Sequence, residues 1–141
     1  MAIESRTIAA FLAAPLWVIG YSVIAGVGLS LEGLGSPRVL LLAVVVYPVC
    51  EEIIFRAWVQ GELSRIRFAR SEYLGLSVAN AVANLFFALT HFFIFMNLSA
   101  LLVFFPGLVF GYFFDHRQNL ILPVSLHAWY NLISLFLPPL W

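Results

Sequence analysis

Charged side chains are scarce in this sequence, and lysine is absent altogether. Only 10% of the residues are Asp, Glu, Lys or Arg, whereas charged residues make up roughly a quarter of a soluble globular domain. Hydrophobic residues account for 63% of the chain, and the mean hydropathy is +1.01. This composition excludes an ordinary soluble domain and indicates an integral protein of the lipid bilayer.

The chain also lacks a net charge and has only one cysteine. The seven acidic residues balance the seven arginines, so no overall field favours a nucleic acid as partner. Cys50 cannot form an internal disulfide bond, and its expected role is that of a small apolar packing residue. No repeat of fixed period is visible in the sequence.

Long hydrophobic runs dominate what is present. A membrane-spanning helix needs about 20 apolar residues, whereas a secretory signal has an apolar core of only about 7 to 15. The first run is therefore interpreted as a retained signal-anchor span. The whole chain is predicted to be a single membrane domain, an all-α polytopic bundle of about five transmembrane helices. The five runs occupy residues 7–29, 38–61, 73–96, 98–114 and 119–138.

The placement of arginine predicts the orientation, because Lys and Arg concentrate in cytoplasmic loops. If the N-terminus is cytoplasmic, Arg38 is the only loop arginine on the outer side of the membrane. We therefore expect a plasma-membrane protein whose C-terminus is outside, with Trp141 as an interfacial anchor. The stretch 65–70 is either an ordinary cytoplasmic loop, which we favour, or a segment held on the inner leaflet by anionic lipids. The arginines expected inside are Arg6, Arg65, Arg67, Arg70 and Arg117.

Two adjacent glutamates, Glu51 and Glu52, interrupt the second hydrophobic run. Charged residues at the centre of a membrane helix cost about 3 kcal/mol on insertion scales and mark functional sites. Arg56 stands one helical turn after Glu52, so these two can neutralise each other, either as a purely structural pair or as part of a site. Glu51 is rotated about 100° away around the helix, which makes it the carboxylate expected to act in chemistry.

Two later runs also carry polar side chains along one helix face. In the third run Asn80, Asn84 and His91 follow helical spacing. The two asparagines are most simply groups that hydrogen-bond between helices. In the fifth run His127 and Asn131 stand four residues apart, either as a packed hydrogen-bonded pair or as residues of a site.

Three further residues are expected to shape helices. Pro123 either starts the fifth helix or loosens it, because proline has no N–H to donate. Gly107 and Gly111 form a G-x-x-x-G pattern in the fourth run. This pattern allows helix backbones to approach closely, and packing is its expected role.

A shared buried polar centre is the simplest explanation for Glu51, His91, His127 and Asn131, because they lie on three spans of one small bundle. A carboxylate, two imidazoles and an amide can activate water, alone or through a metal, and can stabilise an oxyanion. These residues predict hydrolase chemistry. The alternative is a small transporter with a proton or metal path, which the lack of inverted repeats disfavours.

Three motifs resemble those of the CPBP intramembrane proteases, also called the ABI family, which includes the type II CAAX prenyl endopeptidases and bacteriocin-processing proteins. Residues 51–56 resemble E-E-x-x-x-R, residues 87–91 resemble F-x-x-x-H, and residues 127–131 resemble H-x-x-x-N. The motifs occur in this order, each on its own hydrophobic run. The resemblance covers a four-helix catalytic core at 38–135 and leaves 7–29 as an additional N-terminal span.

The resemblance implies an intramembrane endopeptidase acting on a membrane-associated or lipidated protein or peptide. Glu51 would be the general base that activates water, and His91 would help to hold that water. His127 and Asn131 would position the scissile carbonyl and stabilise its oxyanion.

Glu52 and Arg56 would shape the same site by their charge and hydrogen bonds. No cofactor is favoured, since the sequence has no H-E-x-x-H pattern of the zincin type. Zinc is the alternative, with Glu51, His91 and His127 as ligands and water in the fourth position. The same fold could also serve without catalysis, as an immunity or scaffold protein.

Overall fold

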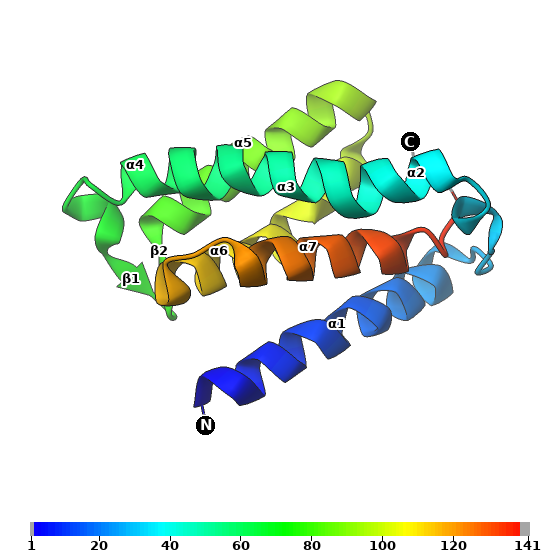
Figure 1. Ribbon diagram of the computed structural model, residues 1–141, viewed down its shortest axis with the longest axis horizontal. Helices are drawn as coiled ribbons and strands as arrows, with labels where there is room; N and C mark the ends of the chain where they lie inside the picture. Colours follow the sequence, from blue (N-terminus) through cyan, green and yellow to red (C-terminus); the bar gives the residue numbers. More distant parts are fainter. Residues whose placement is uncertain (1, 139–141) are drawn as a thin grey trace. The chain divides into compact units, whose positions relative to one another are not determined.

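The computed structural model describes residues 2–138 and is helical over most of them (Figure 1). The all-α expectation is confirmed except for one short hairpin. Trp141, the expected interfacial anchor, lies outside the described residues. The main helices are α1 (Ala2–Ala25), α5 (Val78–Phe95), α6 (Phe104–Arg117) and α7 (Ile121–Ser134), and short 3-10 turns occur at η1 (Glu32–Leu34) and η4 (Phe68–Arg70).

Residues 37–63 form one further run of helix whose turns change width along its length. Ser36 caps its start by accepting a backbone hydrogen bond of 3.4 Å, and Pro37 occupies the first turn. Two stretches have wide π turns. Such turns are rare in proteins, and those that occur are often found at functional sites. The parts in order are α2 (Pro37–Leu40), the π-helical η2 (Leu41–Val46), α3 (Tyr47–Glu52), the π-helical η3 (Ile53–Gln60) and α4 (Gly61–Leu63).

The third span was predicted to begin at residue 73, but the helix begins at residue 78. The preceding residues form an antiparallel hairpin of β1 (Glu72–Tyr73) and β2 (Leu76–Ser77). Its turn has φ values of 55° at Leu74 and 80° at Gly75, the left-handed pair that two-residue hairpins favour. Ser77 then caps α5 by accepting a backbone hydrogen bond of 2.9 Å. The predicted boundary was wrong because hydropathy does not register a turn and a capping serine.

Three helical stretches among the described residues are long and apolar enough to cross a membrane. The last of them joins the 3-10 segment η5 (Leu98–Val103) to α6. α7, with 14 residues, is shorter than the length that a full span requires. The chain is a membrane protein, and the predicted total of five spans stays a prediction beyond these three. The three candidate membrane-spanning stretches are Glu4–Ala25, Val78–Phe95 and Leu98–Arg117.

The chain divides into two compact units. The first unit comprises the residues up to Pro48 and those from Ser125 onward, and it contains α1, α2, η2 and most of α7. The second unit comprises residues 49–124. Within it α5 is the central helix, since it packs against η3, η5 and α6. The single membrane domain inferred for the whole sequence stays a prediction.

Candidate active site

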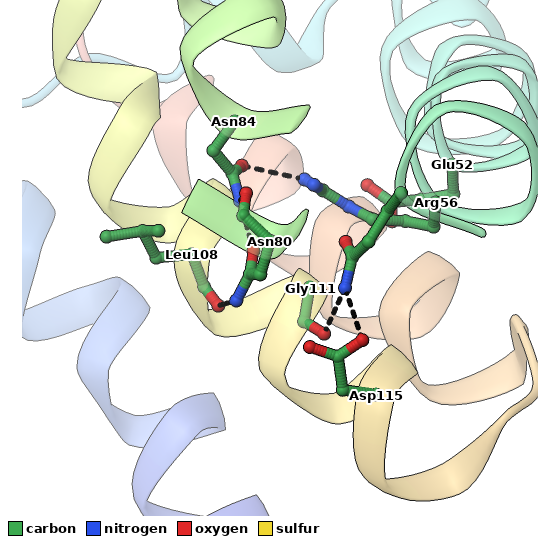
Figure 2. Close-up of polar contacts among 8 residues, drawn as sticks. Glu52, Arg56, Asn80, Asn84, Leu108, Gly111 and Asp115 are labelled. Carbon is green, nitrogen blue, oxygen red and sulfur yellow. Dashed lines mark hydrogen bonds and ion pairs between the residues drawn. The ribbon is translucent and has the colours of Figure 1, made fainter. Parts of the chain in front are cut away.

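A completely buried ion pair lies on one helical segment of the second unit. Arg56 donates from Nε to Oε2 of Glu52 at 3.0 Å, and both side chains are 0% exposed. Arg56 also donates from Nη2 to Oδ1 of Asn84 at 3.0 Å (Figure 2). The pair expected from the four-residue spacing is therefore confirmed, and an asparagine from α5 completes it.

The polar contacts continue from this pair to the end of α6. Gln60 is completely buried and donates from Nε2 to the carbonyl of Gly111 at 3.0 Å and to Asp115 at 2.8 Å (Figure 2). Ser77 donates to the other carboxylate oxygen of Asp115 at 2.7 Å. The sequence interpretation left out Gln60 and ended the fourth hydrophobic run at residue 114, whereas α6 extends through Asp115 to Arg117. We call the connected set the polar column: Glu52, Arg56, Gln60, Asn80, Asn84 and Asp115.

The width of the η3 turns explains how one segment presents three members of the polar column. In an α-helix each residue turns about 100°, so residues eight positions apart lie about 80° apart around the axis. A π turn contains more residues, which reduces this drift for a four-residue repeat. Glu52, Arg56 and Gln60 stand four residues apart and are all fully buried. This repeat was the signal that could have identified Gln60.

The glycines of α6 make room for the amides of α5. A Cβ at Gly107 would collide with Oδ1 of Asn84, and a Cβ at Gly111 would collide with Oδ1 of Asn80. Asn80 also donates from Nδ2 to the carbonyl of Leu108 at 3.0 Å (Figure 2). The packing role expected for the G-x-x-x-G pattern is confirmed, and what packs there is a set of polar side chains.

Two buried atoms of the polar column retain hydrogen-bonding capacity. Nη1 of Arg56 and Oε1 of Gln60 have no hydrogen-bond partner among the described residues. One is a donor and the other an acceptor. Since an unpaired buried polar atom is costly, these two atoms are energetically unfavourable points of the polar column.

His91 is held against Phe87, the first residue of the second motif. Its Nδ1 lies 3.0 Å from the Phe87 carbonyl, and the two rings are 4.4 Å apart. A carbonyl can only accept, so Nδ1 is the donor in this contact, and in the tautomer with this single ring proton Nε2 is an acceptor. The Arg56 guanidinium carbon lies 5.6 Å from the centre of the same Phe87 ring. Phe87 therefore connects the ion pair to the histidine.

Glu51 and Glu52 have different environments although they are neighbours in α3. Glu52 is fully buried, whereas Glu51 is partly exposed. This difference follows from the rotation of about 100° between successive helical residues. The two carboxylates thus cannot share one role.

His127 and Asn131 lie on the part of α7 that belongs to the first unit. His127 is buried, with 4% of its surface exposed, and Asn131 donates from Nδ2 to the carbonyl of Ala43 at 2.8 Å. Pro123 lies in the first turn of α7, which begins at Ile121, and a missing N–H costs little there because the first N–H groups of a helix have no partner within it. The convergence of these residues with Glu51 and His91 stays a prediction from the sequence.

No group of three or more His, Cys, Asp or Glu side chains within the described residues is arranged to hold a metal ion. The zinc ligands considered from the sequence were Glu51, His91 and His127. Two of them belong to the second unit and His127 belongs to the first. That ligand set, and the metal-free alternative, both stay predictions.

Comparison with known proteins gives one family match. Residues 34–133 match the family described as type II CAAX prenyl endopeptidase Rce1-like. No curated protein and no solved structure matches the chain. The matched region contains all three motifs and begins after the end of α1. The catalytic core expected at 38–135 stays a prediction.

Proposed function

Because the chain belongs to the family of type II CAAX prenyl endopeptidase Rce1-like proteins, we propose that it hydrolyses a peptide bond of a membrane-associated or lipidated protein with water activated by Glu51. The family supports an intramembrane endopeptidase of the CAAX protease type. The observation that carries the choice of base is the burial of Glu52 against Arg56. The ion pair gives Glu52 a structural role. Glu51 is therefore the glutamate of the doublet that we propose as the base.

The proposed reaction begins when the Glu51 carboxylate takes a proton from water. The water oxygen attacks the carbonyl carbon of the scissile peptide bond and forms a tetrahedral intermediate with a negative oxygen. Protonated Glu51 then delivers its proton to the leaving nitrogen as the carbon–nitrogen bond breaks. A general base of this kind contributes about 10²-fold to 10⁴-fold in rate.

His91 is suited to holding the attacking water. Its Nδ1–H is committed to the Phe87 carbonyl, so the neutral ring presents Nε2 as a hydrogen-bond acceptor. A water that donates one hydrogen to Nε2 can offer its other hydrogen to a carboxylate. In this proposal the tautomer of His91 is set by the backbone of its own helix.

His127 and Asn131 are proposed to stabilise the oxyanion. The Asn131 amide has two N–H donors, and one of them is used on the Ala43 carbonyl. The second is available for the substrate. Removing one such donor from an oxyanion site costs about 10²-fold to 10³-fold in kcat in enzymes of this type of chemistry.

The Glu52–Arg56 pair is proposed to set the charge of the site and does not itself react. If the Glu52 carboxylate lacked its counter-charge, it would repel the neighbouring Glu51 carboxylate in a region of low dielectric. The guanidinium cancels that charge and links the pair to Asn84 on α5. In this way the polar column keeps the segment that carries Glu51 fixed against α5.

The substrate is proposed to be a membrane-anchored protein or peptide, since the bundle offers its polar groups within the bilayer. The proposed setting is the plasma membrane, with the N-terminus in the cytoplasm and the C-terminus outside. Family membership supports the class of enzyme proposed for this chain. The particular substrate is for experiment to identify.

The test is a digestion assay with the purified full-length protein in liposomes. The probes are a synthetic peptide library and farnesylated peptides ending in a C-a-a-X sequence, read by mass spectrometry. Glu51→Gln should lower cleavage by about 10²-fold or more. The matched control is Glu62→Gln, because Glu62 is 51% exposed in a surface pair with Arg65. Cleavage by Glu51→Gln at the wild-type rate would rule out Glu51 as the base.

The same liposome preparation also tests the two other functions considered from the sequence. A small transporter would show proton or zinc flux in the liposomes and no Glu51-dependent cleavage. An immunity or scaffold protein would show neither flux nor cleavage.

A further inference from the structure

α1 contains a proline that leaves one of its carbonyls without a helical donor. Pro15 lies inside the helix, and proline has no N–H to give to the carbonyl four residues earlier. That carbonyl belongs to Phe11. A carbonyl without a partner is strongly disfavoured in a membrane, so another group has to satisfy it.

The donor comes from the third motif. Trp129 donates from its indole Nε1 to the Phe11 carbonyl at 2.8 Å, and the Phe11 and Trp129 rings are 6.4 Å apart. The next residue, Tyr130, donates its hydroxyl to the Ala10 carbonyl at 3.0 Å. All these groups belong to the first unit, so α1 and α7 are joined at two adjacent carbonyls.

One buried face of α1 is made of small residues. Ala10, Ala14 and Val18 stand four residues apart and are almost fully buried, at 7%, 1% and 4% exposed. Small residues at this spacing allow membrane helices to pack closely. Two long side chains of α7 can therefore reach the α1 backbone itself.

We propose that Trp129 and Tyr130 are positioning residues, which dock α7 on the carbonyls around Pro15 and so fix the setting of His127 and Asn131. On an α-helix, residue 129 points about 180° away from the mean direction of residues 127 and 131. Holding the Trp129 side of α7 therefore fixes the direction in which the two motif residues point. α1 thus acts on the site although it lies outside the matched family region.

The consequence for activity rests on the proposed function, and it concerns turnover. Trp129→Phe removes the indole donor and keeps an aromatic ring. It should lower kcat by about threefold to tenfold, the factor that one interhelical hydrogen bond in a membrane corresponds to. KM should not change, because no substrate contact is removed. Trp58→Phe is the matched control, since Trp58 is 65% exposed on η3.

A double-mutant cycle tests the role of the proline directly. Pro15→Ala restores a backbone N–H at residue 15, which competes with Trp129 for the Phe11 carbonyl. Pro15→Ala should therefore also lower kcat. The double variant should be no worse than Trp129→Phe alone, because the carbonyl is then satisfied by its own helix. Fully additive losses would overturn the proposal.

An NMR measurement detects the Trp129–Phe11 hydrogen bond without the need for a protease assay. The indole N–H resonance of Trp129 in detergent micelles, assigned by its loss in Trp129→Phe, should shift upfield and exchange faster with water in Pro15→Ala. An unchanged resonance would overturn the docking whether or not the protein is a protease. A shifted resonance with unchanged kcat would overturn the positioning role and leave the proposed function standing.

Discussion

Arg56 and Glu52 form an ion pair of 3.0 Å in which neither side chain is exposed to solvent. The two residues belong to consecutive turns of one helical segment, so the segment carries its own counter-charge into the protein interior. Asn84 then accepts from the guanidinium, which ties this segment to α5. The pair is thus a local feature of the sequence with a long-range structural role.

Replacing Arg56 should destabilise the protein strongly. Arg56→Met leaves the Glu52 carboxylate buried without its counter-charge, and such a loss costs about 3 to 5 kcal/mol. The matched variant is Arg65→Met, which removes an exposed pair with Glu62 and should cost less than about 1 kcal/mol. Equilibrium unfolding in mixed detergent micelles, followed by circular dichroism, measures both. Equal effects would contradict the structural role of the buried pair.

A methyl group at Gly111 should disturb the polar column. The added Cβ of Gly111→Ala collides with the Asn80 amide and lies 2.8 Å from Oε1 of Gln60, and overpacking of this kind costs about 1 to 3 kcal/mol. Gly20→Ala is the control, because nothing lies within 4 Å of a Cβ at that position. It should be neutral or stabilising by up to about 1 kcal/mol, since alanine favours helix. The same unfolding measurement decides between these outcomes.

His91 and His116 make the same backbone contact and should differ in function. His116 lies 2.9 Å from the Tyr112 carbonyl through Nδ1, just as His91 lies 3.0 Å from that of Phe87. His91→Ala should lower kcat by roughly 10²-fold if Nε2 holds the attacking water. His116→Ala should leave kcat unchanged, because His116 is an exposed residue at the end of α6. Equal losses in the two variants would argue against a water-holding role for His91.

Metal removal should leave activity intact. In the proposed reaction the Glu51 carboxylate activates water by itself, so treatment with EDTA or 1,10-phenanthroline should not lower the cleavage rate. Zinc content is measured on the same sample by mass spectrometry. Loss of activity on chelation, with recovery on adding zinc, would favour the ligand set of Glu51, His91 and His127 and a zinc-bound water.

The sequence was most informative where chemistry is local. The Glu52–Arg56 pair followed from a spacing of four residues on a helix, and it is present at 3.0 Å. The sequence interpretation missed Gln60, although Gln60 continues the four-residue repeat of Glu52 and Arg56, because the repeat does not reveal a partner for the glutamine. Its partner Asp115 is 55 residues further along the chain, and no spacing rule connects residues at that separation.

Boundaries were also decided by interactions that hydropathy does not measure. The third predicted span included residues that form the hairpin, because Tyr73 and Leu76 are apolar enough to extend the run. The left-handed backbone at Leu74 and Gly75 and the capping bond of Ser77 end it instead. Asp115 likewise remains in α6, because its carboxylate binds Gln60 and Ser77.

The sequence by itself determined that this is a helical membrane protein, which family it belongs to and which glutamate has a counter-charge within one turn. These properties depend on composition and on separations of a few residues, where chain connectivity sets the geometry. Only the tertiary structure decided that the glycines of α6 receive the amides of α5, that Gln60 joins the polar column, and that Trp129 satisfies the carbonyl left by Pro15. Each of these joins backbones far apart in the chain, and their contacts exist only after the helices have packed.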